Sequence, residues 1–283
     1  LPKNNRSIPS WKQWLFRRFP IIQKFNRGRI YWFYEFLGRS LFSENRLRKL
    51  TKKVALNHIK KSIADPELRK KVTPNYEIGC KRRLPSDDYY PALTQKKVEL
   101  VTDSIRSFDQ CGIIDEKGIH REVDVLIWAT GFKVAEFENR GLQVLGRQQK
   151  DLFEYWKKEG PEAHWGTCIA GFPGLLFVLG PNTGLGHNSQ LHIMESQFNY
   201  IIDYLNYLHT LPPTVALDVK KEAQKRFNQQ IQEQLETMVW SSGCKSWYLH
   251  PSGKNATLWP GHTYVYRKQT LKINPEDFEQ LGT

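Results

Sequence analysis

The sequence lacks three features that would narrow its class at once. It has no apolar run close to the roughly 18 residues that a membrane-spanning helix needs. Its 4 cysteines lie far apart and show neither a CxxC motif nor a Cys/His metal-ligand spacing. It also lacks a glycine-rich GxGxxG loop of the kind that holds a dinucleotide. We therefore expect no transmembrane helix, no zinc or other metal site, and a reduced, cytoplasmic protein.

Acidic residues are scarce in one part of the chain. Residues 1–86 hold 22 Lys and Arg against 5 Asp and Glu, a local charge of +17. The other 197 residues hold 20 against 24, a local charge of −4. This asymmetry indicates two regions with different partners. The sequence begins at Leu1 without a signal-peptide pattern, and we expect it to be part of a longer chain.

Helical spacing of apolar residues dominates three stretches. Residues 1–72 read as helices with breaks, and Pro66 after an aspartate is typical of a helix start. Two further amphipathic helices are expected, from about Ser189 to Leu208 and from Asp218 to about Val239. Short β-branched segments predict a hairpin around Asp115 to Gly118. The other strands are expected near Val98–Val101, Val123–Thr130 and Leu175–Leu179.

Two segments have residues suited to a bound anion. In GPNTGLGHNS, Gly180, Gly184 and Gly186 would let the backbone approach a flat ligand closely. Free N–H groups at the following helix start suit phosphate, carboxylate or the edge of a flavin. An ordinary capped turn explains this loop equally well. In GCKRRLPSDDYY, three adjacent cations could bind phosphate, although a solvated basic turn is the commoner meaning of such a run.

The motifs together resemble a family. Asp124, four residues and then the ATGF corner at 129–132 resemble the signature of flavin-dependent class B monooxygenases. GCKRRLPSDDYY is similar to their cofactor-binding basic turn, and GPNTGLGHNS to their late flavin-contacting loop. SGCKSWYLHPSGKNATLWPG resembles the C-terminal segment of the Baeyer–Villiger branch. The matches follow the family's order and cover about Leu68 to Tyr266.

The resemblance implies an α/β fold with two dinucleotide-binding domains, like that of glutathione reductase, and a helical N-terminal region. It assigns residues 1–72 to a helical insertion of the NADPH domain, 73–130 to the end of that domain, and 131–283 to the C-terminal half of the FAD domain. In the family both phosphate loops come earlier in the chain. We therefore expect a C-terminal half that is inactive and free of flavin without an N-terminal half carrying GxGxxG loops.

Site residues follow from the same resemblance. Arg82 is the implied catalytic residue, which stabilises a flavin peroxide anion and positions the nicotinamide. Lys81 is expected to contact the NADPH 2′-phosphate, and Trp247 to lie near the NADP ribose. Arg83 is expected to have no role. The remaining cofactor-binding residues are Asn188, Ser189 and Gln190 at the isoalloxazine ring, and Thr130 and Gly131 at a hinge between domains.

The implied enzyme is an oxidoreductase that uses FAD, NADPH and O₂. It inserts one oxygen atom into a ketone, as in the Baeyer–Villiger reaction, or into a soft heteroatom of a small substrate, through a flavin C4a-peroxide. The alternative is a binding module in which the basic, aromatic region 1–86 contacts an anionic membrane surface or nucleic acid. We expect no nucleic acid partner, because the aromatic run near residue 33 is too continuous for base stacking. Weak association with a membrane surface stays open.

Overall fold

The computed structural model describes residues 1–3, 7–42, 45–131, 141–244 and 246–282. Phe132, the last residue of the ATGF corner, lies outside this range. The chain forms two compact units. The first comprises Leu1–Asn5, Lys52–Asn75 and Leu84–Phe132, and the second comprises Arg6–Thr51, Tyr76–Arg83 and Lys133–Thr283.

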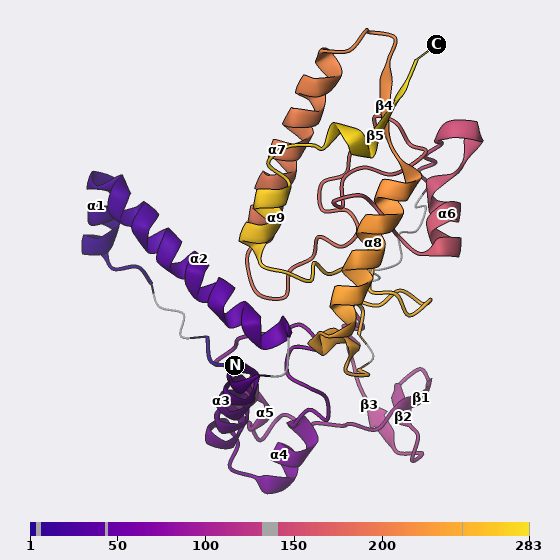
Figure 1. Ribbon diagram of the computed structural model, residues 1–283. Coiled ribbons are helices and arrows are strands. Elements are labelled where there is room, and N and C mark those ends of the chain that lie inside the picture. Colours follow the sequence, from indigo (N-terminus) through magenta and orange to yellow (C-terminus); the bar gives the residue numbers. More distant parts are fainter. Residues whose placement is uncertain (4–6, 43–44, 132–140, 245, 283) are drawn as a thin grey trace. The chain divides into compact units, whose positions relative to one another are not determined.

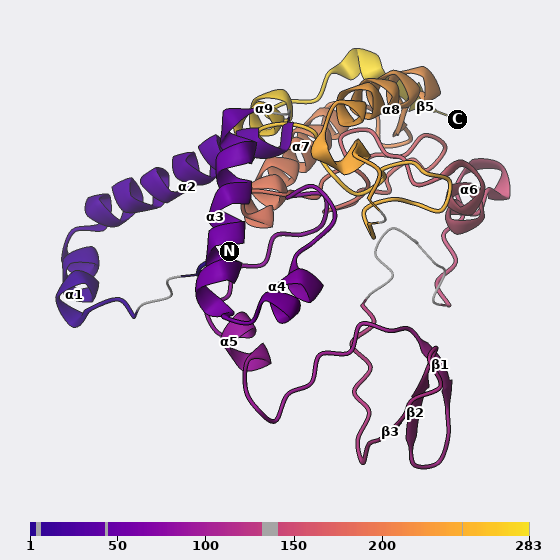
Figure 2. The same ribbon diagram turned by 90° about the horizontal axis from the view of Figure 1, so that it is seen from below.

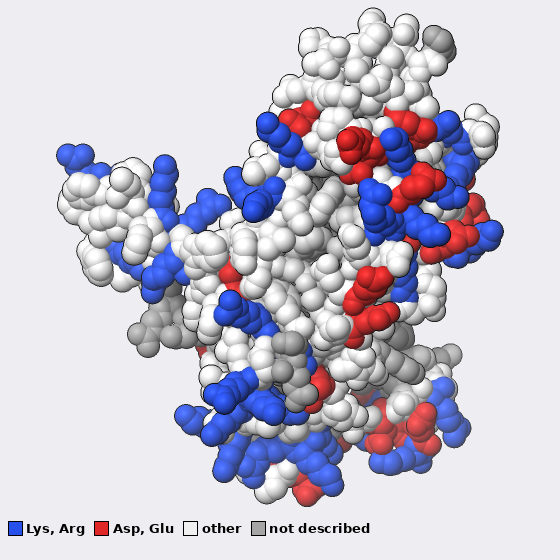
Figure 3. All heavy atoms as spheres, viewed as in Figure 1, with Lys and Arg blue, Asp and Glu red and all other residues white. Residues whose placement is uncertain are grey.

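The first unit combines short helices with a small antiparallel sheet. It contains most of α3 (Arg46–Ser62) and all of α4 (Pro66–Val72) and α5 (Tyr89–Leu93). The Asp65 carboxylate accepts hydrogen bonds from the Glu67 and Leu68 N–H groups, so α4 begins as the Asp-Pro pair predicts. Figure 3 shows Lys and Arg gathered over α3 and α4. The 17 residues of α3 include no acid, which accounts for much of this charge.

The sheet of the first unit is a three-stranded meander (Figure 2). Its strands are β1 (Ile105–Phe108), β2 (Gly112–Asp115) and β3 (His120–Glu122), all antiparallel. The Asp115 carboxylate accepts from the Lys117 and Ile119 N–H groups at 3.0 and 2.9 Å, which closes the turn between β2 and β3. The predicted hairpin is therefore confirmed.

Three of the predicted strands are not formed in the part of the chain that the structure describes. Val98–Val101 and Val123–Thr130 form no ladder, and Leu176 makes only an isolated bridge to Cys168. The side chains of Val125 and Ile127 are 75% and 81% exposed. An apolar strand of this type is stable when neighbouring strands and covering helices bury both of its faces. No described strand pairs with 123–130, so most of its apolar side chains stay exposed.

The second unit is mainly helical (Figure 1). It begins with α1 (Ser10–Arg18) and the 23-residue α2 (Pro20–Phe42), which confirms the helical N-terminal region. The predicted pair of amphipathic helices is present as α7 (Gln190–His209) and α8 (Lys221–Glu236). The other elements are η1 (Arg147–Gln149), α6 (Leu152–Glu159), β4 (Ala216–Val219), η2 (Val239–Ser241), α9 (Thr263–Gln269), η3 (Pro275–Asp277) and β5 (Phe278–Leu281).

Local rules explain the bounds of the two long helices. The Ser189 hydroxyl caps α7 by accepting from the Leu191 N–H. The predicted start of α8 at Asp218 is wrong. Asp218 belongs to β4, which pairs antiparallel with β5. Its carboxylate instead accepts from the Gly171 N–H at 3.0 Å. Helix α9 packs beside α7 in both views (Figures 1 and 2).

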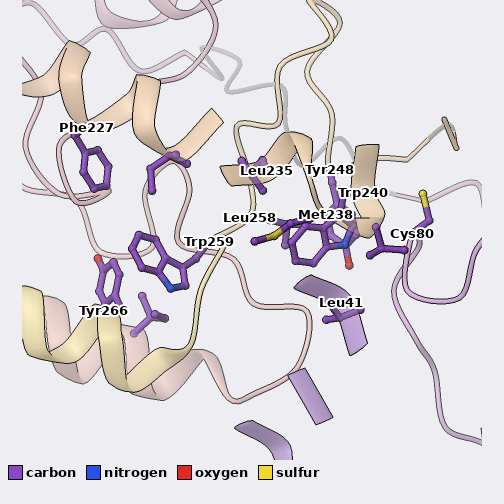
Figure 4. Packing of buried hydrophobic residues seen from close by; sticks show 13 residues of the cluster. Leu41, Cys80, Phe227, Leu235, Met238, Trp240, Tyr248, Leu258, Trp259 and Tyr266 are labelled. Atoms are coloured by element: carbon purple, nitrogen blue, oxygen red, sulfur yellow. The ribbon is translucent and has the colours of Figure 1, made fainter. Parts of the chain in front are cut away.

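Buried apolar side chains form the core of the second unit. The largest cluster joins Leu41 of α2 and Cys80 to Phe227, Ile231 and Leu235 of α8. Figure 4 shows this cluster extending through Trp240 and Tyr248 to Trp259 and Tyr266. It is completed by Ile193, Met238, Val239 and Leu258. The C-terminal end of α2 is therefore part of the same core as α7 and α8.

Candidate functional site

The glycine-rich loop before α7 is held by the segment 255–259. The Asn182 and Gly184 N–H groups donate to the Ala256 and Thr257 carbonyls at 2.8 and 2.7 Å. The Asn182 side chain, which is 1% exposed, donates to the Asn255 and Leu258 carbonyls. These bonds fix the loop before any ligand binds.

Two of the loop glycines, Gly184 and Gly186, are required for packing within the protein. A Cβ at Gly184 would lie 2.7 Å from the Thr257 carbonyl oxygen. A Cβ at Gly186 would lie 2.8 Å from side-chain atoms of both Leu41 and Trp240. At these two positions, glycine allows the loop to pack closely against other parts of the protein.

A cavity of about 270 Å³ lies against this loop. It brings together Arg82, Gln190 and Trp247, three of the predicted site residues. The rest of its lining consists of Leu179, Gly180, Thr183, Gly184, Leu185, Tyr248, Ala256, Thr257 and Leu258. Arg82 is exposed and Trp247 is 41% exposed, so a cation and an indole ring are available at the edge of an otherwise mostly uncharged cavity.

Cys80 and Arg83, the second and fifth residues of the basic turn, attach its first part to other segments of the second unit. Cys80 forms a disulfide with Cys244, 164 residues further along the chain. This corrects the expectation of a fully reduced protein, which rested on sequence separation and could not reveal spatial proximity. Arg83 Nη1 donates to Ser40 Oγ at 3.1 Å, and Arg83 Nη2 to the Gly186 carbonyl at 3.4 Å. Arg83 thus has a structural role that the sequence did not indicate.

The remaining predicted residues are spread over several environments. Lys81 is exposed, and its Nζ lies 4.7 Å from the centre of the Tyr76 ring. Thr130 and Gly131 are exposed and belong to the first unit, whereas the other predicted site residues belong to the second. Asn188 and Ser189 line a separate cavity of about 540 Å³ between α2 and the start of α7.

Gln190 connects the loop to the start of α7. In the orientation that satisfies both ends of its amide, the oxygen accepts from the Leu185 N–H at 2.7 Å. The nitrogen then donates to the Thr183 carbonyl at 3.2 Å. Gln190 therefore joins the loop to the start of α7, and it also lines the 270 Å³ cavity.

Glu35 is a buried carboxylate that the sequence analysis missed. It is 2% exposed and accepts hydrogen bonds from Asn188 Nδ2 at 2.7 Å and from the Thr263 backbone and hydroxyl. His262 Nδ1 lies 2.8 Å from Glu35 Oε2. Burial on its own would raise the pKa of Glu35, but the nearby His187 ring and the donors on Thr263 and Asn188 lower it to about 2. One signal was available, because Glu35 is the sole acid in the sequence of α2.

Comparison with known proteins identifies the class of protein. No protein-family model matches the chain. A Baeyer–Villiger monooxygenase of Pseudomonas aeruginosa is 47% identical over 285 residues, covering 100% of this chain and 54% of that protein. Cyclohexanone monooxygenase from Rhodococcus sp. Phi1 bound to NADP⁺ matches with a TM-score of 0.73 and 25% identity, over 86% of this chain and 46% of that one. The OTEMO complex with FAD and NADP matches with a TM-score of 0.74 and 20% identity, over 85% and 46%.

These matches show the fold of flavin monooxygenases with two dinucleotide-binding domains. The chain belongs to the family of flavin-dependent Baeyer–Villiger monooxygenases and corresponds to a C-terminal portion of such a protein. It spans about half the length of the curated relatives that it matches at full coverage. Within the described part of the chain, no helix has the length and apolar character needed to cross a membrane.

Proposed function

We propose that this chain is the C-terminal part of an FAD- and NADPH-dependent monooxygenase that inserts one oxygen atom of O₂ into a ketone. The alternative acceptor is a soft heteroatom of a small molecule. The observation that carries the proposal is the convergence of Arg82, Gln190 and Trp247 on one cavity, from segments more than 50 residues apart. These are residues that the family resemblance assigns to the cofactors.

The residues at the cavity fit a flat, anionic cofactor. Trp247 presents an exposed indole for stacking, and Arg82 presents an exposed guanidinium group. The Asn182 and Gly184 N–H groups and the Gly184 carbonyl already form hydrogen bonds within the protein, so binding requires little reorganisation of this part of the loop. FAD, when bound, would supply the redox chemistry. Arg82 would hold negative charge that develops at the reacting centre, and the cavity walls would exclude water.

The other residue roles are proposals of the same kind. Lys81, exposed beside Tyr76, would bind the 2′-phosphate of NADPH and so favour it over NADH. Asn188 and Ser189 would meet the isoalloxazine ring at the start of α7, and Trp247 would meet the NADP ribose. Thr130 and Gly131 would form the hinge between the NADPH domain and the FAD domain. On this scheme residues 1–72, 73–130 and 131–283 are the helical insertion, the end of the NADPH domain and half of the FAD domain.

The chain has no GxGxxG loop, so we propose that it needs a segment that supplies both phosphate-binding loops. The isolated chain should therefore purify without flavin and should not oxidise NADPH. A preparation that contains about one flavin per chain would contradict this part of the proposal.

The test is a fusion of this chain to the N-terminal part of the Pseudomonas aeruginosa relative. We expect one bound FAD per chain, NADPH oxidation that depends on a cyclic ketone, and a lactone detected by mass spectrometry. A thioether assayed in parallel distinguishes ketone from heteroatom oxidation. A fusion that binds FAD and oxidises NADPH but oxygenates neither substrate would overturn the proposed reaction.

A second function is favoured by one observation. α1 and α2 expose large apolar side chains between their basic residues, among them Trp11 (66%), Trp14 (61%) and Phe25 (76%). Such a surface suits weak peripheral contact with an anionic membrane. Cosedimentation with vesicles containing phosphatidylserine, at low and high salt, tests this contact. Binding that is absent at low salt would contradict it.

A further inference from the structure

Three potential metal ligands meet where α2, the glycine-rich loop and the start of α9 come together. Their donor atoms, one each from Glu35, His187 and His262, all lie within 4.8 Å of one another. His187 Nε2 is 3.5 Å from Glu35 Oε1, and His262 Nδ1 is 2.8 Å from Glu35 Oε2. Tetrahedral zinc with bonds near 2.1 Å requires donors about 3.4 Å apart. The 3.5 Å separation between His187 Nε2 and Glu35 Oε1 matches this value. The 2.8 Å contact of His262 is a hydrogen bond to the other carboxylate oxygen, which a bound ion would replace.

The ring nitrogens of His187 are buried and lack hydrogen-bond partners among the described residues. The His187 side chain is 1% exposed. A buried polar group without a partner is costly. Its Nε2 faces the Glu35 carboxylate, but at 3.5 Å the contact is too long for a good hydrogen bond. A cation between the two would satisfy this nitrogen.

The surroundings have the features of a built site. Asn188 and Thr263 hydrogen-bond the Glu35 carboxylate and fix its orientation, as outer-shell groups do around metal ligands. The Phe42 ring packs edge-on against both imidazoles, with ring centres 5.5 Å from His187 and 4.9 Å from His262. This apolar contact restricts both rings.

Gly38 makes room for the group on α2. It lies one turn after Glu35, and a Cβ at Gly38 would come within 2.7 Å of the His187 ring. The cavity of about 540 Å³ is lined by His187, Asn188 and Tyr31, so it reaches one of the three proposed ligand residues.

We propose that Glu35, His187 and His262 bind one divalent transition-metal ion with the coordination chemistry of Zn²⁺. Two imidazoles and one carboxylate form an N₂O ligand set that zinc accepts readily, and the single negative charge suits a divalent cation. Bound there, the ion fastens α2 to the loop before α7 and to the first turn of α9. The sequence showed no metal-ligand spacing, because the three ligands come from positions 35, 187 and 262. The proposal does not depend on the proposed monooxygenase activity.

The experiment uses the untagged chain with Cys111→Ser, because Cys111 is an exposed free thiol that could bind zinc. After treatment with EDTA, the chain is titrated with ZnCl₂ by isothermal titration calorimetry. We expect one ion per chain with micromolar or tighter affinity, and a melting temperature that rises with zinc. Titration with CoCl₂ should produce the visible absorption bands of a tetrahedral site.

Matched variants locate the site. Glu35→Gln preserves the shape of the side chain, and His262→Ala removes a ligand that is 18% exposed; each should weaken zinc binding about a hundredfold. His192→Ala is the control, since His192 lines the same cavity outside the cluster and should leave affinity unchanged. If His262→Ala does not fold, Glu35→Gln decides the question. Absence of saturable binding, or binding that Glu35→Gln leaves intact, would overturn the proposal.

Discussion

Cys80 is joined to Cys244 by a disulfide, so the segments that carry Arg82 and Trp247 are covalently linked. Both residues line the same cavity. The linkage closes a loop with a sequence separation of 164 residues, and removing a bond of this kind typically costs about 2–4 kcal/mol.

The first prediction concerns this disulfide. Cys80→Ala should lower the free energy of unfolding by about 2–4 kcal/mol in urea, because the unfolded chain regains freedom. Cys111→Ser, at an exposed thiol, should change it little. Thiol titration of the denatured, unreduced chain should detect two thiols, those of Cys111 and Cys168. Detection of four thiols would show that the bond does not form.

The second prediction separates the cations of the basic turn. Arg83→Ala removes two hydrogen bonds from a charged group and leaves the Ser40 hydroxyl and Gly186 carbonyl without that partner. It should destabilise the chain by about 2 kcal/mol in urea unfolding. Arg82→Ala, at an exposed side chain, should change stability by less than about 0.5 kcal/mol. Equal losses for the two variants would mean that the turn acts as one structural unit.

The third prediction tests the packing of the glycine-rich loop. Gly184→Ala forces a methyl group to within 2.7 Å of the Thr257 carbonyl oxygen, and should destabilise the chain by about 1–3 kcal/mol. Gly28→Ala is the matched control, because Gly28 lies in α2 with nothing within 4 Å of the added methyl. It should instead stabilise the chain by about 0.5–1 kcal/mol, owing to the better helix propensity of alanine. A neutral Gly184→Ala would contradict the close approach.

The fourth prediction concerns acid stability. Burial lowers the pKa of His164 to about 4. The charge of Arg226 also lowers it, whereas the nearby Asp277 carboxylate raises it. The unfolded chain therefore takes up a proton at this position near pH 6.5, before the folded chain does. The free energy of unfolding should fall as the pH drops from 6.5 to 4, by on the order of 3 kcal/mol from this residue.

His164→Gln removes that titration and serves as the control. Its free energy of unfolding should decline less steeply than that of the unaltered chain between pH 6.5 and 4. The Glu35 contribution, with a folded pKa of about 2, is lost only below about pH 4.5 and barely overlaps this window. Parallel pH profiles for the two chains would refute the role of His164.

Local patterns and distant contacts differ in how well the sequence predicts them. α7 was predictable, because helical spacing depends on residues a few positions apart. The strand predicted at 123–130 depends on neighbouring strands that the described chain does not supply. Its β-branched residues favour a buried strand, but Val125 and Ile127 are largely exposed in the structure.

The candidate site residues show the same difference between short motifs and contacts made over long sequence distances. The family motifs point to Arg82, Gln190 and Trp247, which line one cavity in the structure. Each motif is short and continuous, so it can be found in the sequence alone. Glu35 and His187 are 152 residues apart, and no short pattern joins them. Arg83 was missed for a related reason, since adjacent cations look alike until their partners on other segments are known.

Arg82 provides the most direct test of the proposed function. In the FAD-loaded fusion, Arg82→Ala should leave flavin reduction by NADPH within severalfold of the unaltered protein. It should lower the yield of oxygenated product at least about a hundredfold, since loss of one fixed charge at a developing anion costs on the order of 3 kcal/mol. Lys81→Ala should instead raise the KM for NADPH with little change in product per NADPH consumed. Rapid-mixing absorbance for the reduction and mass spectrometry for the product measure both steps. An Arg82→Ala protein that still oxygenates ketone normally, or that loses reduction as fully as oxygenation, would contradict the account.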